Sequence, residues 1–173
     1  ENVTLDETTL IPLGNAEYRR REEMLSNGQT DDPFFALSKQ FAAADIIVVA
    51  APFWDMGIPS KLKIYFEDVS VSGIAFACNE KGDFVGLCKA EHLVYITTRG
   101  MDITDGSVME QASPYLKALA MFFGIPNFSM VSAISLDTKP DEAERRVDEA
   151  IIRARNLAKV EKLFSKKERR TDC

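Results

Sequence analysis

Two short loops carry the residues of this chain that could hold an aromatic ligand. The first loop, residues 52–57, follows the apolar run 46–51 and contains a proline, two aromatic rings, an acid, a methionine and a glycine. The second loop, residues 97–101, follows the apolar run 93–96 and contains two threonines, an arginine, a glycine and a methionine. The candidate binding residues are Pro52, Phe53, Trp54, Asp55, Met56, Thr98, Arg99, Gly100 and Met101.

These residue types suit a planar ring with a polar edge. Phe53 and Trp54 can form an apolar wall, and backbone amides near the start of the next helix can donate hydrogen bonds to the polar edge. Gly100 lets the backbone approach a ring closely. If both apolar runs are parallel strands, their loops leave the same edge of the sheet and form one site. Taken alone, Phe53 and Trp54 could equally complete the hydrophobic core.

The chain lacks the common phosphate-binding and nucleophile motifs. It contains no G-x-G-x-x-G, no G-x-x-x-x-G-K-[ST] and no G-x-S-x-G. The single histidine, His92, and three cysteines without a Cys-x-x-Cys pair provide neither a metal site nor a Cys/His catalytic set. We therefore expect His92 to be structural, and we predict no catalytic side chain and no metal.

Composition indicates one globular domain and argues against two classes of partner. The chain has 173 residues, of which 46% are apolar and 28% charged, which suits one domain with a real core. A net charge of -6 argues against nucleic acid or an anionic membrane as partner. No apolar run reaches the length of a membrane span. Three scattered cysteines suit a reducing, cytoplasmic location.

The first half of the chain predicts alternating strands and helices. Residues 2–5 alternate like a strand with one covered face, and residues 15–26 permit a surface helix. A stronger helix starts at Pro33 and leads into a strand over residues 45–51. That strand shows no alternation, so we expect both of its faces to be covered, as in a parallel sheet.

The second half continues the same pattern. A helix begins near Ile58, and residues 74–78 and 84–87 form a hairpin that is an excursion from the main sheet. A strand over 93–98, a helix over 108–123 and a strand over 127–134 follow. The last helix starts near Pro140 and presents an apolar stripe, namely Val147, Ile151, Ala154, Leu157 or Ala158, and Phe164. This order predicts one doubly wound α/β domain over residues 1–173. It has three layers, with a parallel sheet between two layers of helices.

The combined motifs resemble those of a known family. The matching pieces are Ala50-Ala51-Pro52, Leu62-Lys63-x-Tyr65-Phe66, Gly73-x-x-Phe76, Ile96-Thr97-Thr98-Arg99-Gly100, Asp105-Gly106, Pro114-Tyr115-Leu116 and Phe123-Gly124-Ile125. Over about residues 1 to 160 the chain resembles the FMN-dependent NADH-azoreductases, which are flavodoxin-like quinone reductases.

The resemblance implies a cofactor, a reaction and a partner. It implies that both loops hold FMN, that NADH or NADPH reduces it, and that quinones or azo compounds are the acceptors. No covalent protein nucleophile is needed, because the protein binds, orients and electronically biases the flavin. The resemblance also implies a homodimer.

The chain departs from the family pattern in three places. Asp55 stands where the family usually has Asn, and its carboxylate would oppose a reduced, anionic flavin. Met101 stands where glycine is common. The family's first strand, phosphate-binding loop and first helix should come before Glu1, so we expect a further βα unit of about 35–45 residues there. These departures keep a second hypothesis open, in which the chain is a regulatory or interaction protein with weak or absent flavin binding.

Overall fold

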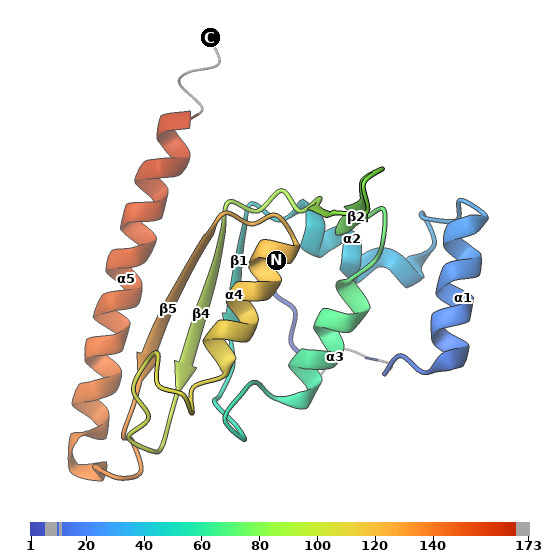
Figure 1. Cartoon of the computed structure of the whole chain (residues 1–173). Coiled ribbons are helices and arrows are strands. Elements are labelled where there is room, and N and C mark those ends of the chain that lie inside the picture. Colours follow the sequence, from blue (N-terminus) through green and yellow to red (C-terminus); the bar gives the residue numbers. More distant parts are fainter. Residues whose placement is uncertain (6–9, 11, 169–173) are drawn as a thin grey trace.

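A parallel sheet lies between helices on both of its faces (Figure 1). The structure is a computed structural model that describes residues 1–5, 10 and 12–168, with only the helical backbone described for 161–168. The strands are β1 (Ile46–Ala50), β2 (Phe76–Cys78), β3 (Phe84–Gly86), β4 (His92–Thr98) and β5 (Asn127–Ala133). The helices are α1 (Asn15–Ser26), α2 (Ala36–Ala43), α3 (Ser60–Val69), α4 (Ala112–Phe122) and α5 (Ala143–Glu168), with short 3-10 turns at Pro33–Phe35 and Pro140–Glu142.

The three long strands form the main sheet in the order β1-β4-β5, and both pairings are parallel. Ile46 is level with His92, and His92 is level with Asn127, so the three strands start together. The predicted doubly wound α/β fold is therefore confirmed, and the carboxyl ends of β1 and β4 meet at one edge. The predicted hairpin is also confirmed, because β2 and β3 pair antiparallel as a separate two-stranded sheet.

Two apolar layers hold the helices against the sheet. On one face, Ile47, Val49, Leu93 and Tyr95 pack in a core with apolar residues of α2, α3 and α4. On the other face, the side chains of β5 that point away from this core contact α5. This second layer consists of Val131 and Ala133 of β5 and of Val147, Ala150, Ala154 and Leu157 of α5. The helical repeat of α5 thus buries Ala150 instead of the predicted Ile151, which is 41% exposed. The side chain of Phe164, also predicted to face the sheet, is outside the described residues.

The prediction that both faces of the strand over residues 45–51, which is β1, are covered is wrong. Ile47 and Val49 are buried, whereas Ile46 and Val48 are 41% and 58% exposed. The reason is lateral position: α5 packs on β5, which lies two strands away from β1. An apolar run without alternation therefore marks a strand here, but it does not show that a helix covers each face.

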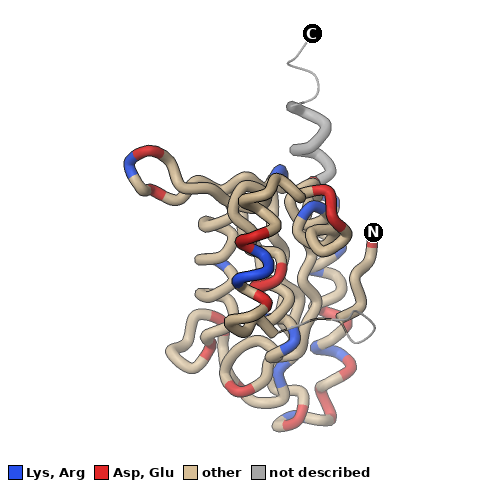
Figure 2. Tube along the Cα trace, turned by 90° about the vertical axis from the view of Figure 1, so that its right-hand side faces the viewer, with Lys and Arg blue, Asp and Glu red and all other residues tan. Residues whose placement is uncertain are grey.

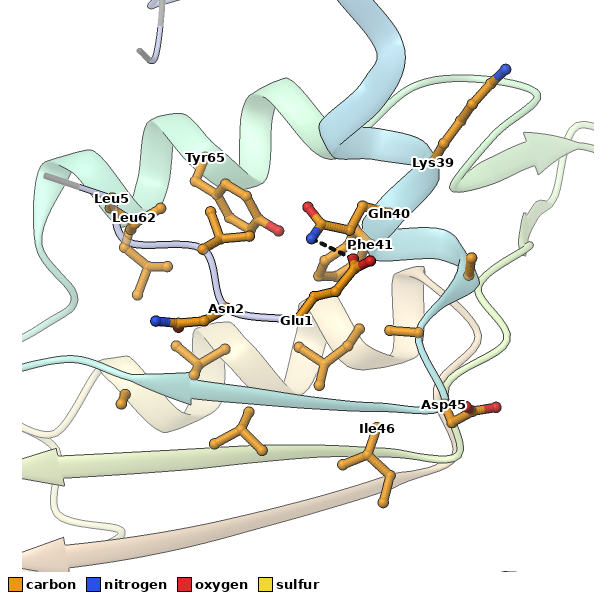
Figure 3. A pocket seen from close by; sticks show the side chains of 17 residues that line it. Glu1, Asn2, Leu5, Lys39, Gln40, Phe41, Asp45, Ile46, Leu62 and Tyr65 are labelled. Carbon is orange, nitrogen blue, oxygen red and sulfur yellow. Dashed lines mark hydrogen bonds between the residues drawn. The ribbon is translucent and has the colours of Figure 1, made fainter. Parts of the chain in front are cut away.

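The predicted strand over residues 2–5 is also wrong. These residues have no regular structure, apart from a turn at Leu5, and they border a groove of about 910 Å³ along the open edge of β1 (Figure 3). Phe41, Leu62 and Tyr65 line this groove together with β1. The backbone at 2–5 lies across the groove from β1, so it has no strand beside it with which to form a ladder. Gln40 donates a hydrogen bond to Glu1 at 2.8 Å across one end.

Two helices begin later than the sequence predicts. The helix expected near Ile58 begins at Ser60, with Pro59 as its N-cap residue. The helix expected over 108–123 begins at Ala112, and Val108 is 88% exposed in the loop before it. None of the described helices is both long enough and apolar enough to cross a membrane. Figure 2 shows Lys and Arg residues interspersed with Asp and Glu along the chain.

The hairpin is fixed to the end of α4 by close backbone packing. Cys88 donates its amide to the Phe123 carbonyl at 3.2 Å, and Leu87 donates to the Ala75 carbonyl at 2.9 Å. The rings of Phe76 and Phe122 pack with centroids 4.6 Å apart. These contacts place the half-buried Cys88 thiol against the core beside Tyr65, and burial raises the pKa of Cys88 to about 11 and that of Tyr65 to about 12.

We predict that stability falls between pH 9 and pH 11, in part because of Cys88. The thiol of the unfolded chain ionises near its ordinary pKa of 9.0, whereas the folded thiol keeps its proton until about pH 11. As the pH rises through this window, proton loss favours the unfolded state, by roughly 1 kcal/mol once screening of a half-buried thiol is counted. Urea unfolding at pH 7, 9 and 10.5 should give a smaller decline for Cys88→Ala than for the unmodified chain. Cys78→Ala, at an exposed thiol, is the control, and equal declines in all three proteins would contradict the prediction.

Candidate functional site

The two candidate loops lie side by side at the carboxyl ends of β1 and β4. The Ala51 amide donates to the Ile96 carbonyl at 3.1 Å, and the Phe53 amide donates to the Thr98 carbonyl at 3.2 Å. The parallel pairing thus continues beyond β1 into the first loop. Gln111 donates its amide to the Met56 carbonyl at 2.9 Å, which attaches the start of α4 to the same loop. The sheet therefore brings together the two segments that the sequence predicted would meet.

The first loop contains a tight turn of unusual backbone conformation. Trp54 and Gly57 exchange two backbone hydrogen bonds, of 3.1 and 2.8 Å. Asp55 and Met56 between them have positive φ angles of 47° and 65°. This is the pattern of a type I′ turn, which asparagine and glycine adopt most easily. Asp55 suits its position because Asp and Asn both tolerate positive φ, but Met56 is strained there.

The turn presents an aromatic ring and free backbone donors to the solvent. Trp54 is 61% exposed, whereas Phe53 is half-buried and packs against the core. Within the described part of the chain, the amides of Asp55 and Met56 donate no hydrogen bond. Since polar backbone groups normally find partners in protein or water, such amides are available to a ligand. Trp54 is thus not a core residue, which removes that alternative for its ring.

The second loop is held by the segment that follows β5. The carbonyls of Arg99, Gly100 and Met101 all accept hydrogen bonds from backbone amides of residues 135–138, at 3.0–3.2 Å. In contrast, the amides of Gly100 and Met101 donate no hydrogen bond within the described residues. A side chain at Gly100 would place its Cβ 1.9 Å from the Asp137 carboxylate. A residue with a Cβ at position 100 would therefore displace the exposed Asp137 side chain, a tertiary contact that the sequence did not reveal.

The predicted binding residues divide into exposed and buried groups. Pro52, Trp54, Asp55, Thr98 and Met101 are exposed, and Phe53, Met56 and Gly100 are half-buried. The Arg99 side chain is 0% exposed and lies within the protein. The structure thus brings eight of the nine residues to the surface at one edge, and it places the ninth below them.

Two acidic residues beside the Arg99 guanidinium were not among the predicted site residues, because their contacts are tertiary. Asp105 lies 2.7 Å from the Arg99 guanidinium and accepts hydrogen bonds from the Ser132 hydroxyl at 3.0 Å. Glu110 is 0% exposed and lies 3.7 Å from the same guanidinium. Its carboxylate accepts hydrogen bonds from both the amide and the hydroxyl of Ser113, at the start of α4. The position of an acidic residue shortly before a helix was the available signal for Glu110.

The groove beside β1 is a separate feature. Its lining residues come from residues 1–5, α2, the 43–50 segment and α3, and none of the nine candidate residues is among them. In the part of the chain that the structure describes, His, Cys, Asp and Glu residues form no group of three that could hold a metal ion.

An α/β sheet with two loops at the carboxyl ends of adjacent parallel strands defines the class of protein, the doubly wound α/β proteins, in which ligands commonly bind at this edge of the sheet. A family model described as "Flavodoxin-like fold" matches residues 3–158. The chain belongs to this family.

Relatives and solved structures agree with this assignment. The chain is 38% identical over 127 residues to an FMN-dependent NADH:quinone oxidoreductase of Clostridium beijerinckii, covering 73% of this chain and 63% of the relative. It is 34% identical over 126 residues to an FMN-dependent NADH:quinone oxidoreductase 2 of Bacillus subtilis, covering 72% and 59%. The chain thus spans less than two thirds of the length of these relatives. An azoreductase from Bacillus anthracis superimposes with a TM-score of 0.76 at 22% identity, covering 89% of this chain and 78% of that one.

Proposed function

We propose that this chain functions as an FMN-dependent NAD(P)H oxidoreductase that reduces quinones or azo compounds. The observation that carries the proposal is the pairing of an exposed Trp54 ring with four amides, on two adjacent loops, that donate no hydrogen bond to any described residue. The relatives, which are FMN-dependent NADH:quinone oxidoreductases, support the same cofactor and donor. One structural neighbour, at 23% identity, is an azoreductase in complex with FMN.

The residues of the two loops fit the ring of this cofactor. An isoalloxazine has an aromatic face and an edge of hydrogen-bond acceptors, and the loops provide an aromatic side chain beside backbone donors. We assign the ring contacts to Phe53, Trp54, Asp55 and Met56 of the first loop, and to Thr98, Gly100 and Met101 of the second. FMN bound there would supply the electron transfer between NAD(P)H and the acceptor. The protein would orient the ring, donate hydrogen bonds to its polar edge and leave one face open to substrate.

Asp55 and Met101 do not oppose this assignment. Asp55 is exposed, so water can solvate its carboxylate, and its side chain is free to point away from the ring. Met101 is 53% exposed, and its flexible thioether can adapt to an aromatic surface. No protein side chain needs to act as a nucleophile in this reaction.

Association and location are further parts of the proposal. We propose a homodimer in the cytoplasm, with a small aromatic or quinone substrate as the other partner. Four exposed apolar side chains follow the ends of β1 and β4 and support a protein interface next to the site: Trp54, Met101, Val108 and Met109. Cys78 and Cys88 are free thiols, which suits a reducing compartment. A monomeric mass in solution at micromolar concentration would contradict the dimer.

The domain boundary belongs to the same proposal. We propose that residues 1–173 lie in one flavodoxin-like domain, and that a βα unit contributes a strand to the groove beside β1. The open backbone edge of β1, the exposed Ile46 and Val48 and the groove of about 910 Å³ support this placement. In the resembled family such a unit carries the phosphate-binding loop.

Flavin binding tests the proposed function directly. The purified chain should be yellow, or should become yellow after incubation with FMN and gel filtration. Trp54→Ala should weaken FMN binding about tenfold, because it removes the stacking surface of an exposed ring. Fluorescence titration of FMN measures the affinity. Phe84→Ala is the matched control, since Phe84 is equally exposed, at 66%, but belongs to the hairpin.

The two negative outcomes have different meanings. A colourless protein that fails to take up added FMN would remove the oxidoreductase proposal and would favour the regulatory or interaction role. If Trp54→Ala binds FMN as tightly as the unmodified chain, the proposal of FMN as cofactor stands, but Trp54 does not contact the flavin ring.

A further inference from the structure

Arg99 is a buried cation whose position stability alone does not explain. Its side chain is 0% exposed, and it is the largest of the fully buried side chains. Burying a guanidinium is costly, and a well-packed apolar residue in such a place is often as stable or more stable. Its Nε atom is buried without a hydrogen-bond partner. Such a group requires a reason other than filling the core.

The contacts of Arg99 connect three segments that surround the ligand site. Just after the second loop, the Arg99 Nη1 donates hydrogen bonds to the Ile103 carbonyl at 2.9 Å and to Asp105 at 2.7 Å. On the side of α4, Nη2 lies 3.7 Å from Glu110. On the side of the first loop, the guanidinium carbon lies 5.1 Å from the centre of the Phe53 ring.

The partners of Arg99 are themselves held in place. The Asp105 carboxylate accepts one bifurcated hydrogen bond from the Ser132 hydroxyl on β5, and Glu110 accepts from the Ser113 amide at 2.9 Å. The guanidinium is therefore held against β5 and α4 by contacts that do not involve the first loop. Because a cation attracts the face of an aromatic ring, a fixed guanidinium also fixes the ring above it.

The ring that Arg99 holds stands next to the exposed part of the site. Phe53 directly precedes Trp54, and its amide is already bonded to Thr98. The turn that follows contains Asp55 and Met56 at positive φ, a conformation that persists only where surrounding structure imposes it. Holding the Phe53 ring in place limits the conformations that the Trp54–Gly57 turn can adopt.

We propose that Arg99 is a positioning residue: it holds Phe53, and through it the Trp54–Gly57 turn, at the place where Trp54 and the free amides of both loops face one ligand. The assignment rests on the proposed function, since that ligand is FMN. Arg99 makes no contact with the flavin, because its side chain is buried and its backbone amide and carbonyl are bonded to Ala133 and Leu136.

Conservative variants separate positioning from folding. Arg99→Lys keeps the cation near Asp105 but loses the planar fork, and Phe53→Leu keeps apolar volume but loses the ring face. Both should weaken FMN binding about tenfold, and the double variant should bind no more weakly than either single one. Arg153→Lys is the matched control, because Arg153 donates to the Ser132 carbonyl from α5, away from the loops.

A second readout works without any flavin. Trp54 is the single tryptophan of the chain, so acrylamide quenching of its fluorescence reports on the turn alone. Arg99→Lys and Phe53→Leu should both raise the quenching constant, and Arg153→Lys should not. If Arg99→Lys lowers the urea midpoint while quenching is unchanged, or if the two single effects multiply in the double variant, Arg99 does not position the turn. If the unmodified chain binds no FMN but quenching responds as expected, the positioning role holds and the proposed function fails.

Discussion

Replacing Arg99 by alanine is expected to lower the free energy of unfolding by about 3–5 kcal/mol, because it leaves a buried carboxylate without its cation. Glu110 is 0% exposed and has the Arg99 guanidinium 3.7 Å away. Without that guanidinium, the Glu110 charge is compensated only by the hydrogen bonds from Ser113. Urea unfolding, followed by circular dichroism, measures the difference.

Two further variants show whether the unpaired charge causes the loss. Arg99→Ala combined with Glu110→Gln should recover part of the stability, because a neutral amide can still accept from the Ser113 amide without a buried charge. Arg145→Ala removes an arginine whose ion pairs with Glu142 and Glu149 are on the surface, so it should change stability little. A cost for Arg99→Ala no larger than that for Arg145→Ala would show that the buried network does not stabilise the fold.

Replacing Gly86 by alanine is expected to cost about 3 kcal/mol, since the added methyl group meets backbone that cannot rotate away. Its Cβ would lie 2.0 Å from both the Gly124 nitrogen and the Phe123 carbonyl carbon. The hairpin must therefore move away from the end of α4, which also separates the Phe76 ring from Phe122. Urea unfolding gives the total cost, and hydrogen exchange should show lost protection in β2 and β3.

Gly57→Ala is the matched control for Gly86→Ala. It adds the same methyl group in another loop, but the nearest atom is 3.9 Å away and the backbone φ is not in the left-handed region. It should therefore change stability by well under 1 kcal/mol. If both alanine variants are equally stable, the close approach of β3 to α4 is not a constraint on the fold.

The sequence predicted the fold class because its local patterns are strong. The apolar runs at 46–51 and 93–98 became β1 and β4, and the glycine-containing segment 79–83 became the hairpin turn. Each pattern depends on neighbouring residues along the chain, such as β-branched runs and turn formers. The two loops also met as predicted, since successive parallel strands place their carboxyl ends together.

Features that depend on distant neighbours could not be predicted. Exposure of Ile46 and Val48 depends on where α5 lies, and the missing strand at 2–5 depends on what lies across the groove. Gly100 looked suited to a close ligand, and the structure adds that a Cβ there would displace the Asp137 carboxylate, which is 37 positions further along the chain. None of these contacts leaves a periodic trace in the sequence.

By itself, the sequence determined the α/β order of elements and the aromatic and polar character of the two loops, because residue type and spacing fix both. Only the tertiary structure decided which loop side chains are exposed and which are buried. It turned Trp54 outward on a positive-φ turn and placed Arg99 beneath Phe53. The physical reason is that burial is a property of the packed chain: the same arginine binds a ligand or supports a loop according to which segments fold over it.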